Sequence, residues 1–137
     1  MIRLALTLAL LVFGYAALAG GAQEASESWT KLESARGRYV VEYRVVRGEL
    51  AFKQLFDLEV RVTSTTEPGE RPLHLSVDAR MPHHGHGMRV KPTIDQPEPG
   101  RFLVRGMRLQ MPGDWELSFD VRRGSVVERS ARWIEVD

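Results

Sequence analysis

The sequence contains no cysteine. This absence excludes disulfide bonds, thiolate metal sites and a cysteine nucleophile. It also excludes acylation of a lipoprotein-type cysteine. A folded domain of this composition must therefore be stabilised by its hydrophobic core alone.

The chain also lacks an excess of either charge, with 19 basic and 18 acidic residues among 137. Near-neutral charge argues against nucleic acid or an anionic membrane surface as the partner. Catalytic motifs are missing as well. There is no G-x-S-x-G elbow, no H-E-x-x-H and no phosphate-binding glycine loop. We therefore expect no enzymatic activity.

Residues 1–22 have the pattern of a secretory signal peptide. Arg3 supplies the positive start, residues 4–18 carry no charge, and Ala17-Leu18-Ala19 is a cleavage signal. We expect a periplasmic or secreted protein whose mature chain begins near Gly20 or Gln23. The alternative is an uncleaved anchor, because the apolar stretch approaches the ~20 residues that span a bilayer.

The remaining chain has the length of one domain. Residues 23–36 are polar, with Trp29 and Leu32 at helical spacing, which indicates a short helix or a loose leader. From residue 37 apolar and polar residues alternate, as in strands with one buried face. The alternation predicts a core that contains Val41, Tyr43, Phe56, Leu58, Val60, Leu75, Val77, Trp115, Leu117 and Phe119.

Turn signals rich in proline and glycine separate the alternating runs. About seven short strands at such spacing predict an all-β fold, an immunoglobulin-like antiparallel β-sandwich over residues 37–137. Gly106 interrupts one β-rich stretch and predicts a bulge there.

Residues 81–88 read Met-Pro-His-His-Gly-His-Gly-Met and contain three of the four histidines. Imidazole and thioether are ligands that favour copper over magnesium, calcium or zinc. The candidate metal ligands are His84, His86, His83, Met88 and Met81. On a strand, His84 and His86 would share one face, and His83 would point to the other unless the glycines curl the loop.

Two alternatives weaken this metal hypothesis. Met81 is in phase with the inward face of its strand, so core packing suits it better than ligation. The histidines also fit a solvated polar turn. His74 lies on the polar face of its strand and is expected at the surface.

Residues 73–137 resemble the YtkA-like family, which is related to FixH-type proteins. The similarity rests on the histidine segment, on Pro99-Gly100-Arg101-Phe102, and on Met111-Pro112-Gly113-Asp114-Trp115-Glu116-Leu117. The resemblance implies a small exported or membrane-anchored bacterial domain with an immunoglobulin-like fold. Such domains often occur beside copper-handling or respiratory-oxidase assembly proteins.

Two functions follow from these observations. In the first, the His/Met loop binds copper, as Cu(I) or Cu(II), and carries it to an exported or membrane protein partner. Protons would compete for the imidazole nitrogens, so affinity should fall in acid. In the second, the loop is a metal-free interaction module that takes part in assembling an exported or membrane complex.

Overall fold

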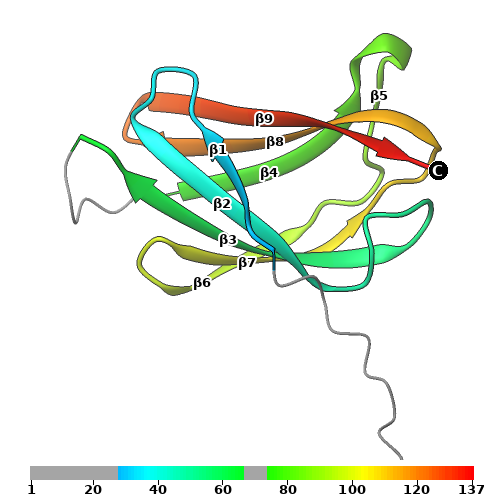
Figure 1. Cartoon of the computed structure of the whole chain (residues 1–137), viewed down its shortest axis with the longest axis horizontal. Coiled ribbons are helices and arrows are strands. Elements are labelled where there is room, and N and C mark those ends of the chain that lie inside the picture. Colours follow the sequence, from blue (N-terminus) through cyan, green and yellow to red (C-terminus); the bar gives the residue numbers. More distant parts are fainter. Residues whose placement is uncertain (1–27, 67–73) are drawn as a thin grey trace, which may run out of the picture.

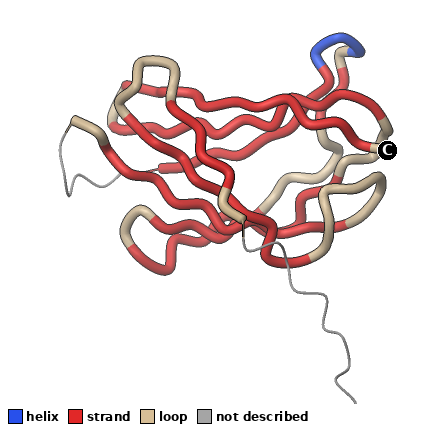
Figure 2. Tube along the Cα trace, in the orientation of Figure 1, coloured by secondary structure: helices blue, strands red, loops and turns tan. Residues whose placement is uncertain are grey.

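The computed structural model describes residues 28–66 and 74–137. Within them the chain forms nine strands and one 3₁₀ helix: β1 (Thr30–Glu33), β2 (Tyr39–Arg47), β3 (Leu55–Ser64), β4 (His74–Met81), η1 (Pro82–His84), β5 (His86–Gly87), β6 (Thr93–Glu98), β7 (Arg101–Arg108), β8 (Gly113–Arg123) and β9 (Val126–Val136). Figures 1 and 2 show these strands along the chain.

The strands build two antiparallel sheets. One has the order β1-β2-β3-β7-β6 and the other the order β5-β4-β8-β9. Figure 1 shows β4, β8 and β9 as one layer and β3, β7 and β6 as the layer facing it. The predicted all-β antiparallel sandwich is therefore confirmed.

The core lies between the sheets and follows the alternation of the sequence. All the residues predicted for it are buried, and Trp115, Phe56 and Phe119 are the bulkiest of its fully buried side chains. On β4 the burial pattern alternates at every residue, with His74 exposed and Met81 buried. Because strand side chains point to opposite faces in turn, one row of each strand enters the core and the other meets solvent.

Three strands were not predicted, namely β1, β5 and β6. All lie at the edges of their sheets and bury few side chains, so their alternation is weak. The short helix considered for residues 23–36 is wrong, because Thr30–Glu33 is extended and Leu32 pairs with Val41 of β2. The sandwich therefore begins before residue 37.

The bulge predicted at Gly106 is confirmed. Phe56 pairs with Met107 and Leu58 with Val104, so β7 has one more residue than β3 over this interval. Gly106 adopts φ 79°, a left-handed conformation that suits glycine. Its amide donates to Oδ1 of Asp57 at 2.9 Å, which satisfies the donor that the bulge removes from the sheet.

Several predictions fall outside the described residues. These are the signal peptide or anchor over residues 1–22, the turn at residues 67–69 and the placement of Leu73. In the part of the chain that the structure describes, no helix is long and apolar enough to cross a membrane.

Candidate functional site

The histidine segment forms the tip of a hairpin at one end of the sandwich (Figure 1). Strand β4 ends at Met81, residues Pro82–His84 make one 3₁₀ turn, and Gly85 reverses the chain at φ 64°. Strand β5 then returns along β4 and pairs His86 with Met81. Proline at the first turn position and a left-handed glycine after it suit such a tight reversal.

His83 lies on the outer face of the four-stranded sheet. Its ring stacks on Trp133 of β9, with centroids 5.6 Å apart and planes inclined by 21°. Trp133 pairs with Glu116, whose neighbour across the sheet is Arg80, and all three side chains belong to the solvent face. Trp133 remains 49% exposed, so this aromatic pair forms an open surface.

His86 lies on the inner side of the same sheet edge. Directly opposed residues of an antiparallel pair have their side chains on one face, with Cβ atoms about 4.5–5.5 Å apart. The register sets His86 opposite Met81. The pairing continues two residues further with Met88 opposite Ala79, because the Met88 amide donates to the Ala79 carbonyl at 3.1 Å. One imidazole and two thioethers therefore share the inner side of this hairpin.

One of these positions corrects the geometry expected for the metal ligands, and another agrees with the expectation for Met81. His84 belongs to the 3₁₀ turn, so the spacing argument that puts His84 and His86 on one strand face does not hold. Met81 is only 1% exposed and packs in the core, as its phase predicts, so its sulfur would have to leave that packing to bind an ion. Among the described residues no group of three or more His, Cys, Asp or Glu side chains is arranged to hold a metal ion.

The outer face carries a charged network beside the aromatic pair. Arg129 makes two 2.7 Å hydrogen bonds to Asp120, and Arg80 lies 3.6 Å from Glu116. The hydrogen bond with Asp120, aided by the charges of Asp120, Glu116 and Asp78, raises the pKa of Arg129 despite its desolvation. Asp120 and Glu116 are thus engaged with arginines. The candidate metal ligands at the histidine tip are therefore its imidazoles and thioethers.

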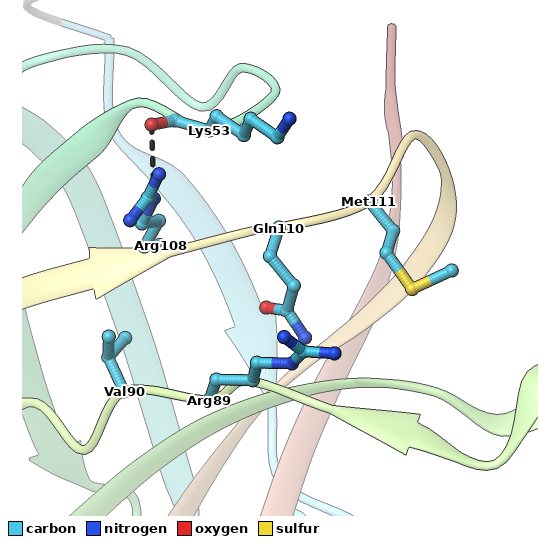
Figure 3. Close-up of a pocket in the computed structure, with 6 residues that line it drawn as sticks. All are labelled: Lys53, Arg89, Val90, Arg108, Gln110 and Met111. Carbon is cyan, nitrogen blue, oxygen red and sulfur yellow. Dashed lines mark hydrogen bonds between the residues drawn. The ribbon is translucent and has the colours of Figure 1, made fainter.

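A cavity of about 280 Å³ lies beside the hairpin. It is lined by Lys53, Arg89, Val90, Arg108, Gln110 and Met111 (Figure 3). Met111 belongs to a segment that carries the family resemblance, but the sequence does not single out the other five residues. No local signal marks them, because they come from three loops and a strand end that meet only in the folded chain.

Comparisons with family models, with curated proteins and with solved structures found no match. The resemblance to the YtkA-like family, and the immunoglobulin-like topology that it implies, therefore stay predictions.

Proposed function

We propose that this protein is an exported copper-binding domain that captures copper at the β4–β5 hairpin and passes it to a periplasmic or membrane protein. The observation that carries the proposal is the register of the hairpin. It sets His86 opposite Met81, and it places Met88 on the same side of the hairpin as these two residues. Imidazole with thioether is a soft donor set suited to copper(I).

The ligands differ in how easily they reach an ion. His86 is exposed and Met88 is half-buried at the rim of the core, so both can bind without unfolding the hairpin. His84 is exposed in the adjacent turn and is the third candidate. His83 is held on the opposite face by Trp133 and stands outside this set. An exposed and incompletely coordinated ion suits transfer, because a closed site retains its metal.

Copper(I) titration against a chromophoric competing chelator tests the proposal. His86→Ala and Met88→Leu should each weaken binding about tenfold or more, which corresponds to ~1.4 kcal/mol or more. Met88→Leu conserves volume and so keeps the half-buried packing. His74→Ala is the matched control, because His74 is an exposed histidine at the far end of β4, and it should bind as the wild type does.

Binding should also weaken between about pH 7 and pH 5, because protons compete with copper for the imidazole nitrogens. Equal affinity of the wild type and both site variants would contradict the proposal. So would a loss of affinity in His74→Ala as large as that in His86→Ala.

A metal-free interaction module is the second candidate, and the exposed His83–Trp133 stack favours it. Aromatic side chains that are half-exposed and rigidly stacked are typical anchors of protein interfaces. In that case Trp133→Ala would abolish binding of the partner, and the wild type would bind no copper above background. The copper titration and the partner assay therefore separate the two functions.

A further inference from the structure

The cavity beside the hairpin is strongly basic. Lys53, Arg89 and Arg108 contribute three cations to its lining, and none of the lining residues is acidic. Three like charges around one hollow repel one another unless an anion neutralises them. The hollow is distinct from the inner side of the hairpin where we place copper.

One of these cations, Arg108, is held by a backbone carbonyl, and Lys53 belongs to a loop of uncommon conformation. Nε of Arg108 donates to the Lys53 carbonyl at 3.2 Å. The two terminal nitrogens of this guanidinium take no part in that hydrogen bond. Lys53 itself has φ 59°, an uncommon conformation for a residue with a side chain. Its amide donates to the carbonyl of Leu109, the residue that follows β7, at 2.9 Å. A conformation of this kind persists only where the surrounding structure fixes the backbone.

Gln110 supplies a neutral acceptor to the same hollow. Its Nε2 donates to the Gly87 carbonyl at 2.7 Å, which fixes the orientation of the amide. Its Oε1 is buried and has no hydrogen-bond partner among the described residues. Figure 3 shows this oxygen turned toward the side of Val90 and Arg108. A buried acceptor without a partner requires an explanation, and a ligand hydroxyl would provide one.

We propose that this cavity binds a small oxyanion that also carries a hydroxyl group, the chemistry shared by hydrogen phosphate and hydroxycarboxylates. The guanidinium groups of Arg89 and Arg108 bind the anionic oxygens, for which their planar donors are suited. Lys53 adds a point charge at the rim, and Oε1 of Gln110 accepts from the hydroxyl. The volume lies at the lower limit of ligand pockets, which suits a small ion.

The test titrates the folded protein with hydrogen phosphate, citrate and tricarballylate, each at constant ionic strength set with chloride. Tricarballylate matches citrate except for the hydroxyl. Amide NMR shifts of the cavity residues should saturate with phosphate, with citrate or with both. The anion that saturates them identifies whether the cavity takes a phosphate or a hydroxycarboxylate. Tricarballylate should bind about tenfold more weakly than citrate wherever citrate binds.

Arg89→Gln and Arg108→Gln should each weaken binding of the better anion about tenfold. Arg89→Gln removes no hydrogen bond that the fold shows for this side chain, so it tests the site even where Arg108→Gln perturbs the Lys53 loop. Arg105→Gln is the matched control, because Arg105 lies on β7 outside the cavity and pairs with Asp95 at 3.3 Å. It should bind as the wild type does.

Shifts that rise linearly with every salt, or that persist unchanged in Arg89→Gln and Arg108→Gln, would overturn the proposal. Equal affinity for citrate and tricarballylate would overturn the role of Gln110. Anion binding that survives His86→Ala, in a protein that no longer binds copper, would show that the two sites are separate.

Discussion

Glu59 departs from the alternation of its strand. It belongs to the solvent face of β3 by alternation, yet its side chain is only 2% exposed. Arg44 donates to it at 2.7 Å and Arg101 at 2.6 Å, and these arginines bracket Glu59 from the strands on either side. Arg44 also lies over the ring of Trp29 at 4.8 Å, so the bracket continues into a cation–π contact.

Burial raises the pKa of the Glu59 carboxyl, but the hydrogen bonds and charges of Arg44 and Arg101 outweigh it and hold the pKa below its ordinary value. The carboxylate is therefore stabilising at pH values above its ordinary pKa, and the contribution is lost as the pH falls through the lowered pKa. Acid should consequently weaken the fold through this residue.

Glu59→Gln should lower the free energy of unfolding by about 2–3 kcal/mol near neutral pH, since it leaves two arginines without their common partner. The difference from the wild type should shrink as the pH falls below the ordinary pKa of the carboxyl and through its lowered pKa in the folded protein. Urea unfolding at several pH values measures both effects. Glu98→Gln is the control, because Glu98 is an exposed partner of Arg101 and should change stability by less than about 0.5 kcal/mol.

At the scale of elements, the bulge in β7 sets which side chains of this strand face the core where it pairs with β3. The extra residue at Gly106 restores the phase of the strand, so that Val104 and Met107 both enter the core although they are three residues apart. Without the bulge, one of these side chains would point to solvent. The same strand then leads to Arg108 and Gln110 at the basic cavity.

Gly106→Ala should destabilise the protein by about 1–2 kcal/mol, because φ 79° costs that much for a residue with a Cβ. Nothing lies within 4 Å of the added Cβ, so strain rather than a clash sets the cost. Gly106→Asn should cost less than Gly106→Ala, since asparagine tolerates this conformation. Thermal unfolding of the two variants checks the order, and equal midpoints would contradict the strain argument.

At the scale of the molecule, the segment that follows β1 joins the two sheets along one side of the sandwich. The Ala35 amide donates to the Arg129 carbonyl at 2.9 Å, and Ser34 donates to the buried carboxylate of Glu128 at 2.6 Å. Nε of Arg38 lies 3.1 Å from the other carboxylate oxygen of Glu128 and forms an ion pair with it. The two groups are not aligned as a hydrogen bond. The residues expected to form a leader therefore close the edge of the fold.

A chain that starts at residue 37 should be less stable than one that starts at residue 23 by at least about 1–3 kcal/mol, because the Glu128 carboxylate loses the hydrogen bond from the Ser34 hydroxyl. Strand β2 would also become an unprotected edge and promote association. Calorimetry and light scattering of the two chains measure these effects. Identical unfolding midpoints would show that β1 is dispensable.

The sequence by itself predicts the two-sheet fold, its core and the bulge at Gly106, because burial at every second residue is a local property of a strand. It also locates the histidine turn and assigns Met81 to the core by phase alone. Only the tertiary structure decides that His84 lies in a 3₁₀ turn rather than on one strand face with His86, and that His83 stacks on Trp133, because Trp133 belongs to a strand distant in sequence. The basic cavity and the buried Glu59 depend in the same way on residues distant in sequence, and their contacts arise only when separate strands and loops come together.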